Sequence, residues 1–403
     1  MLHLHHANRY NMQEEGLIVA CQRTAFAKAK RGGFRFMRAD DLAVECLTQL
    51  WDRLPGLEKG MVEDLIVGCA NPEGEQGLQI GRQIAIRAFG QSVPGMTVNR
   101  YCASGLETIA IATAKIRAGM GSVYVAGGVE SMSSIPMEGY KLAVNYDVSV
   151  EHPDYVIGMG LTAEAVASKY KISREAQDEF AVRSHSKAES ARRAGLFAQE
   201  LGAVKVHEVY FKDGRRAERD FVVGEDEGIR ADTSIEALSA LKPVFAAGGS
   251  VTAGNSSQTT DGAGFVVLMS AEKVRNYGLS PIGRIVSCSV AGVDPLYMGI
   301  GPCAAIPLAL KSAGLTLNDI SLVELNEAFA AQSIAVIREA GLDPEKVNVN
   351  GGAIALGHPL GCSGARLTMT ILNELARRKQ RYGLVTACVG GGQGIAAVIE
   401  NLI

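Results

Sequence analysis

The chain has 403 residues, of which 47% are apolar and 21% charged, and its formal net charge is −3. The length predicts two or three domains, and the composition supplies ample material for hydrophobic cores. Without a strong positive charge there is no electrostatic argument for nucleic acid or an anionic membrane as the main partner, so we expect a soluble metabolic protein.

Residues 1–15 precede the first strand-like run and are predicted to be an N-terminal extension. They lack the long apolar run and cleavage site of a secretory signal. Their histidines (His3, His5 and His6) fit an unstructured extension better than a metal site. The apolar run 383–399 is broken by glycines and is shorter than a bilayer-spanning helix, so we predict no membrane segment. The 8 cysteines are scattered without a C-x-x-C pair, which argues against a bound metal and favours a reducing cytoplasm.

Short apolar runs typical of buried strands alternate with helical patterns along the chain. The clearest runs cover residues 65–70, 122–128, 265–270 and 383–389. Apolar residues recur at helical spacing after Cys102 and again after Gly364. This alternation predicts a layered α/β architecture.

Two segments of this pattern echo one another. VNRYCASG, a helix and SVYVAGG come in the first part of the chain, while VNGGAIALGHPLGCSGAR, a helix and GLVTACVGGG come in the last part. The echo suggests an internal duplication, with two α/β halves whose reactive loops meet. Residues 133–256 differ, with two charged helical patterns and a polar stretch. We interpret them as an insertion that covers the crevice and helps to bind substrate, or alternatively as a plain surface subdomain.

Cys102 precedes Ala-Ser-Gly and a helical pattern, which predicts a thiol at a helix N-terminus. There the helix dipole and free backbone N–H groups favour the thiolate, the nucleophilic form. A buried structural cysteine is the alternative, since that is the usual role of a free thiol.

His358 lies in Gly-His-Pro, where an imidazole could take a thiol proton and stabilise a nearby charge. Cys388 follows an apolar strand and precedes three glycines. A second thiol could serve as acid and base for a carbon acid, and Gly390 could leave an N–H free for an oxyanion. An ordinary packed histidine and a tight Gly-Gly-Gly turn are the alternatives.

NEAFAAQ (326–332) follows a strand-like run. Asn326 could orient a water or donate to an oxyanion, with a helix cap as the compatible alternative, and Phe329 could wall an apolar tunnel. The small-residue loop 251–264 contains Ser257, a candidate hydrogen-bond donor, although such loops are usually only turns.

Together these motifs resemble the thiolase family over nearly the whole chain from about residue 16. RYCASG, NEAF, GHP and CVGGG occur in the family's order, and SREAQDEFAVRSH, ALKPVF, SVTAGNSSQ and MGIGP look like the degradative 3-ketoacyl-CoA thiolases. The resemblance implies a five-layer αβαβα fold. Its expected parts are an N-terminal half (16–132 plus 257–280), an inserted loop domain (133–256) and a C-terminal half (281–403).

The resemblance also implies a mechanism in which His358 activates Cys102 for attack on the keto carbonyl of a 3-ketoacyl-CoA. Cys388 then protonates the departing acetyl-CoA carbanion, and a second CoA thiol releases the shortened acyl group. His358 with a water on Asn326 would form one oxyanion hole, and the N–H groups of Cys102 and Gly390 the other.

The same resemblance implies the substrate contacts. Ser257 and Ala253 would bind the pantetheine arm of CoA, Met159 and Phe329 would line its channel, and Arg230 would lie near the nucleotide. CoA is expected as a co-substrate, with no permanently bound cofactor and no metal. A homodimer or homotetramer is expected, and a hydratase–dehydrogenase subunit is a further candidate partner.

Some short-chain biosynthetic thiolases have a His-Met pair where this chain reads Gly158-Met159. The missing histidine favours a degradative enzyme of fatty-acid β-oxidation. The alternatives are an acetoacetyl-CoA thiolase that condenses two acetyl-CoA molecules, and a non-catalytic CoA-binding protein. The latter is expected to have lost a reactive residue, and none is missing.

Overall fold

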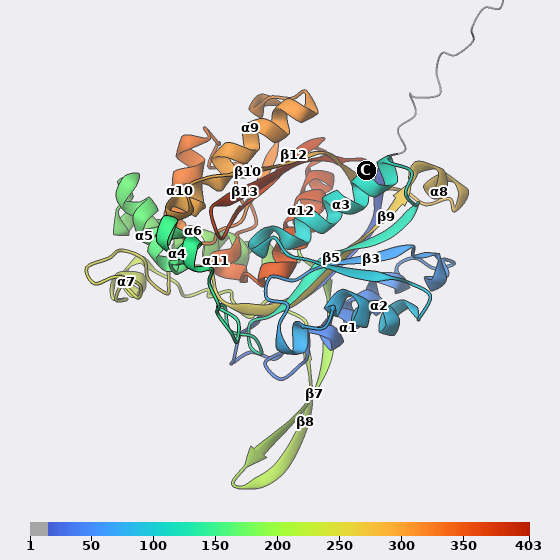
Figure 1. The fold of residues 1–403 in the computed structure, drawn as a ribbon, viewed down its shortest axis with the longest axis horizontal. Helices are drawn as coiled ribbons and strands as arrows, with labels where there is room; N and C mark the ends of the chain where they lie inside the picture. The colour runs from blue at the N-terminus through green and yellow to red at the C-terminus, as the bar shows by residue number, and fades with distance from the viewer. Residues whose placement is uncertain (1–14) are drawn as a thin grey trace, which may run out of the picture.

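The computed structural model describes residues 15–403, so His3, His5 and His6 of the predicted extension lie outside the described residues. Two α/β halves dominate the structure, and each is built from the same succession of strands and helices (Figure 1). Their hydrogen bonds join into one 11-stranded sheet. Nine strands follow the order β11-β12-β13-β10-β1-β9-β5-β3-β4, and the short β2 and β6 pair with β9 and β1 beside this path.

The first half contributes one side of this sheet and three helices. Its strands are β1 (Gly16–Thr24), β3 (Asp64–Gly68), β4 (Gly95–Val98), β5 (Val123–Ser131) and β9 (Thr260–Ser270), with the short β2 (Ala27–Lys28) paired to β9. Its helices are α1 (Ala39–Asp52), α2 (Ile80–Phe89) and α3 (Ser104–Arg117). Helix α8 (Ala271–Asn276) leads out of it.

The second half repeats that order. Its elements are β10 (Gly283–Gly292), α9 (Gly301–Ala313), β11 (Leu322–Leu325), α10 (Ala330–Glu339), α11 (Ala353–Leu356), α12 (Leu360–Arg378), β12 (Tyr382–Val389) and β13 (Gln393–Asn401). An isolated parallel bridge between Val323 and Val347 takes the place that β4 has in the first half. The predicted duplication is therefore visible in the topology.

Three hydrophobic cores separate five layers. One core lies between α1, α2 and the first-half strands, a second surrounds α3 and α12, and a third lies between α9, α10 and the second-half strands. Successive side chains along β9 point to opposite faces of the sheet, so Phe265 belongs to the first core and Val266 to the second. Helices α3 and α12 thus form the middle layer, between the two halves (Figure 1). The five-layer expectation is confirmed.

The connection from β5 to β9 is the segment interpreted as an insertion. It carries α4 (Tyr146–Glu151), α5 (Met159–Lys169), α6 (Arg174–Arg193), β6 (Leu201–Gly202), β7 (Val204–Lys212), β8 (Arg215–Val223) and α7 (Ile235–Ser239). It is tied to the first half, because β6 pairs with β1 and the fully buried Arg23 bonds Glu200 and Asp226.

The polar stretch in this segment forms a hairpin that the sequence analysis did not predict. Strands β7 and β8 pair along their full length and project from the body (Figure 1). The turn residues Asp213 and Gly214 both have positive φ, 51° and 75°. Asp-Gly is a preferred sequence for such a two-residue turn. The turn sequence therefore indicates a hairpin, but the charged residues on either side of it are not typical of strands.

Short 3-10 helices complete the fold. They are η1 (Lys59–Met61), η2 (Gly74–Gln76), η3 (Tyr101–Ala103), η4 (Pro153–Val156), η5 (Pro295–Ile300) and η6 (Leu317–Asp319). Among residues 15–403, one helical stretch, Pro295–Ala313, has the length and hydropathy of a membrane span. Its α9 part packs against β10 and β13, which is the environment of a core helix.

Candidate active site

Cys102 lies in η3, directly before α3, as predicted. The turn is tight: Tyr101 has a φ of 43°, and Ser104 donates its hydroxyl to the Tyr101 carbonyl at 2.7 Å. The backbone N–H groups of Gly390 and of Cys102 itself stabilise a charge on the sulfur, which favours the thiolate. Burial outweighs them and raises the pKa of the Cys102 thiol to about 12. The thiol therefore stays protonated in the free protein, and attack by its sulfur requires a base.

Close contact between α3 and α12 brings the two reactive loops together. A Cβ at Gly105 would lie 2.8 Å from the Gly361 carbonyl oxygen, and one at Gly364 would lie 2.1 Å from the Leu106 nitrogen. Only glycine permits this backbone-to-backbone approach. As a result Cys102, before α3, shares a small apolar cluster with Leu360 at the start of α12.

His358 lies between α11 and α12 and is 4% exposed. Its Nδ1 lies 2.5 Å from Ser363 Oγ, and its Nε2 lies 3.2 Å from Asn326 Nδ2. Burial, aided by the positive charge of Arg366, lowers the pKa of His358 to about 3. The imidazole is therefore neutral in the free protein and has a lone pair to accept a proton.

Cys388 lies near the end of β12, the strand that leads into the glycines 390–392. Burial raises the pKa of its thiol, and the neighbouring Cys102 raises it further. The two sulfurs are therefore close enough to interact electrostatically. Cys388 also packs with Phe329 and Met159, so the predicted channel residues share a cluster with it.

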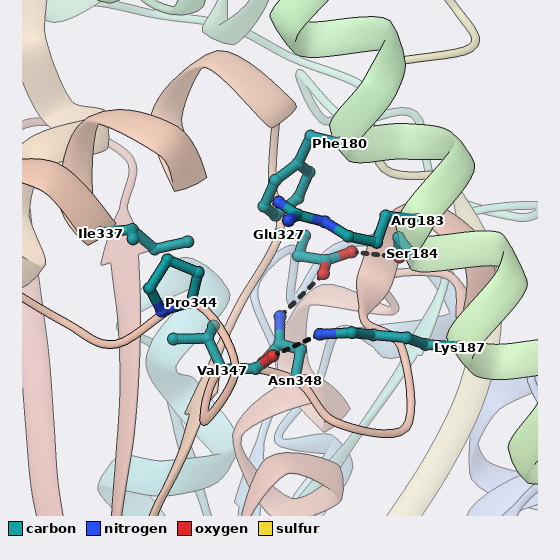
Figure 2. Close-up of a pocket in the computed structure, with 9 residues that line it drawn as sticks. All are labelled: Phe180, Arg183, Ser184, Lys187, Glu327, Ile337, Pro344, Val347 and Asn348. Atoms are coloured by element: carbon teal, nitrogen blue, oxygen red, sulfur yellow. Dashed lines mark hydrogen bonds between the residues drawn. The ribbon is translucent and has the colours of Figure 1, made fainter. Parts of the chain in front are cut away.

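Asn326 follows β11, and its backbone N–H bonds the Thr386 carbonyl at 2.9 Å. The next residue, Glu327, is a buried carboxylate that accepts from Ser184 Oγ at 2.6 Å and Asn348 Nδ2 at 2.8 Å (Figure 2). The cavity beside Glu327 measures about 10 Å³, room for one water and not for a substrate. These buried bonds fix the turn that aims Asn326 at His358.

The loop that contains Ser257 lies between the asparagine and histidine motifs. The Ser257 N–H bonds the Ala328 carbonyl at 2.9 Å, and the Gln258 carbonyl accepts from the His358 N–H at 3.0 Å. Ala253, on the same loop, is exposed. Arg230 is also exposed, and the hydrogen bond that the structure gives it joins its N–H to His185 rather than to the thiols.

The sequence analysis did not single out three residues that hold this site. Ser363 contacts His358, Arg366 places a buried charge near it, and Glu130 accepts from the N–H of Gly361 at 2.8 Å. Ser363 lies within the GCSGAR part of the histidine motif. Glu130 could have been found as a lone carboxylate in an apolar strand, since such a group requires buried donors.

Within residues 15–403, no group of three or more His, Cys, Asp or Glu side chains gathers as a metal site. The structure instead brings Cys102 to Leu360, two residues after His358, and brings Cys388 near Cys102. Two thiols and a neutral imidazole on neighbouring loops are suited to covalent transfer of an acyl group.

The buried imidazole predicts a pH effect on stability. Below pH 6.5 the unfolded chain protonates His358 and the folded chain does not, so stability falls as the pH falls and levels off near pH 3. Between pH 7 and pH 5 the free energy of unfolding is expected to fall by about 2 kcal/mol from this cause.

Urea unfolding at both pH values should show a smaller loss of unfolding free energy for His358→Gln than for the unchanged chain. Cys102→Ala, which keeps the imidazole, is the control, and equal losses in all three would contradict the prediction.

These features define an acyltransferase whose active site lies between two duplicated α/β halves. Residues 17–272 match the model of the thiolase N-terminal domain, and residues 279–401 match that of the thiolase C-terminal domain. The chain belongs to the thiolase family.

Individual relatives agree with this assignment. The chain is 51% identical over 389 residues to a 3-ketoacyl-CoA thiolase of Bacillus subtilis, covering 96% of this chain and 99% of the relative. It is 46% identical to a 3-ketoacyl-CoA thiolase of Chromohalobacter salexigens, covering 96% and 98%. Among solved structures, the Bacillus anthracis acetyl-CoA acetyltransferase matches with a TM-score of 0.87 and 40% identity, covering 97% and 100%. The human mitochondrial 3-ketoacyl-CoA thiolase matches with a TM-score of 0.86 and 37% identity, also covering 97% and 100%.

Proposed function

We propose that this protein cleaves 3-ketoacyl-CoA with CoA, giving acetyl-CoA and an acyl-CoA two carbons shorter. The observation that carries the proposal is the approach of the reactive loops of the two halves. Cys102 packs with Leu360, two residues after the neutral His358, and Cys102 raises the pKa of the neighbouring Cys388 thiol. The names of the bacterial relatives support the same reaction.

In the first half-reaction, His358 Nε2 takes the proton of the Cys102 thiol, and the sulfur attacks the 3-keto carbon. The tetrahedral intermediate collapses with cleavage of the C2–C3 bond, which leaves the acyl group on sulfur. The electron pair of that bond stays on C2, and Cys388 protonates it to give acetyl-CoA. The high pKa of the Cys388 thiol keeps that proton in place until a strongly basic carbon needs it.

In the second half-reaction, a CoA thiol gives its proton to the Cys388 thiolate and attacks the thioester. The shortened acyl-CoA leaves, and the Cys102 sulfur takes back the proton held by His358. Cys102, His358 and Cys388 are then in their starting protonation states, so the cycle closes without an external acid or base.

Two sets of donors are proposed to stabilise the oxyanions. The N–H groups of Cys102 and Gly390 both stabilise charge at the Cys102 sulfur, and we propose that they donate to the oxygen of the acyl group that this sulfur carries. Asn326 Oδ1 is buried and finds no donor among the described residues. A water bound there would complete the second set with His358, because a buried carbonyl oxygen requires a partner.

Substrate binding is proposed for the segment that links β5 to β9. Met159 begins α5 of this segment, and Phe329 packs beside it near Cys388. We infer that these two line the pantetheine channel, that Ser257 and Ala253 contact its arm, and that Arg230 lies near the nucleotide. The boundaries 16–132 with 257–280, 133–256 and 281–403 remain our proposed division of the chain.

We further propose that the protein acts in the cytoplasm as a homodimer or homotetramer, with a hydratase–dehydrogenase as a candidate partner. Condensation of two acetyl-CoA molecules is the second candidate function. The match to the Bacillus anthracis acetyl-CoA acetyltransferase favours it. Gly158, where some biosynthetic thiolases have histidine, favours cleavage of longer chains.

The test is thiolysis of 3-ketoacyl-CoAs from four to sixteen carbons. Higher kcat/KM with medium or long chains would support the degradative function. Activity confined to the four-carbon substrate would assign the protein to the short-chain class, and no activity with any of them would overturn the proposal.

A further inference from the structure

The side of His358 that faces away from Asn326 contacts the first turns of α12. Ser363 Oγ lies 2.5 Å from His358 Nδ1 and 2.9 Å from the Pro359 carbonyl oxygen. Both His358 and Ser363 are buried, with 4% and 1% exposure. Because both groups are buried, His358 Nδ1 and Ser363 Oγ form their hydrogen bonds with protein atoms rather than with bulk water.

The Pro359 carbonyl can only accept, so the single hydroxyl proton of Ser363 is used in the bond to it. With that bond made, Ser363 Oγ accepts from His358 and the ring proton lies on Nδ1. Asn326 Nδ2 lies 3.2 Å from Nε2 and, as a donor, fits an unprotonated Nε2. Both contacts are compatible with the Nδ1–H tautomer.

We propose that Ser363 is a positioning residue that holds His358 in the Nδ1–H tautomer, which leaves Nε2 unprotonated as the base. This inference rests on the proposed function, in which Nε2 is the base. The Pro359 carbonyl also accepts the N–H groups of Cys362 and Ser363, both at 3.0 Å. Pro359, in turn, lies directly beside His358 in the chain. The first turn of α12 is therefore the rigid support on which the ring is oriented.

Serine suits this position for a geometric reason. Its hydroxyl bonds the carbonyl four residues earlier, which fixes the side-chain rotamer on the helix. The remaining lone pairs then face the loop before the helix, where the imidazole lies. Alanine would leave the Nδ1–H buried without an acceptor and would free the ring to exchange tautomers. Loss of one such buried partner corresponds to about a 10- to 100-fold effect.

The test compares Ser363→Ala with Thr368→Val. Thr368 is fully buried on the same helix and makes the same kind of bond, to the Gly364 carbonyl at 2.9 Å, but it has no contact with His358. Ser363→Thr, which restores the hydroxyl, is the rescue variant. The readout is the 15N NMR spectrum of histidine-labelled protein, with His358 assigned by its loss in His358→Asn.

We expect His358 to be protonated on Nδ1 in the unchanged chain and in Thr368→Val, and to exchange between tautomers in Ser363→Ala. Alkylation of Cys102 by iodoacetamide should slow about 10- to 100-fold in Ser363→Ala only, with recovery in Ser363→Thr. A proton on Nε2 in the unchanged chain, or an unaltered spectrum in Ser363→Ala, would overturn the proposal. Both readouts work without 3-ketoacyl-CoA, so a failure of the proposed function would be seen separately, as lack of thiolysis in the unchanged chain.

Discussion

Replacing Cys102 by alanine is expected to lower kcat for thiolysis by at least about 10⁴-fold, the largest effect of any single change in this chain. The reason is that no other side chain is expected to form the covalent acyl-enzyme between departure of acetyl-CoA and arrival of CoA. Cys388, the neighbouring thiol, is fully buried in its own cluster and does not have the paired N–H groups of Cys102 and Gly390 around it. It is therefore not expected to substitute as nucleophile.

The measurement is steady-state thiolysis together with mass spectrometry of protein incubated with acetyl-CoA. The unchanged chain should carry one acetyl group on the peptide that contains Cys102, and the alanine variant none. Cys303→Ala is the matched control, because this half-buried thiol lies on α9 in the outer layer. An acetyl group on any other cysteine, or substantial turnover by Cys102→Ala, would refute the role of Cys102.

Replacing Cys388 by alanine is expected to separate the two half-reactions. Cleavage of the C2–C3 bond should fall about 10²- to 10⁴-fold, because a carbanion needs an acid placed beside it. Exchange of labelled CoA into acetyl-CoA should fall much less, since a CoA thiolate leaves more readily than a carbanion. The acetyl group should still appear on Cys102.

The comparison of exchange with cleavage rates is the informative measurement, since loss of folding would reduce both alike. Cys388→Ser provides a second variant in case the buried alanine is poorly accommodated, because the serine side chain is of similar size and keeps a weakly acidic proton. Equal losses in exchange and cleavage would show that Cys388 has no special role in proton transfer to carbon.

Much of the fold could be predicted from the sequence because its strands and helices carry strong local patterns. The four predicted strands correspond to β3, β5, β9 and β12, and the helices after Cys102 and around Gly364 correspond to α3 and α12. The duplication was also visible, since both halves carry the same order of glycine-rich loop, helix and strand. The β7–β8 hairpin was missed because its charged residues hid the alternation along strands that have only one protected face.

The candidate reactive side chains could be proposed from the sequence alone, since thiols, an imidazole and an asparagine in glycine-rich motifs have few other uses in combination. Their chemical state did not follow. The position of Cys102 at a helix N-terminus favours the thiolate, but burial has the larger effect and raises the pKa of its thiol to about 12. Desolvation depends on every neighbour in space, so only the tertiary structure could decide that the thiol and the imidazole are both neutral.

The supporting residues were likewise decided in three dimensions. Glu130 holds the start of α12 from the first half, Glu327 fixes the turn of Asn326, and Ser363 faces His358 across a helix turn. The sequence by itself determined the candidate reactive groups and the order of the elements that carry them. The tertiary structure determined their protonation, their orientation and their partners, because these depend on contacts between segments that are far apart in the chain.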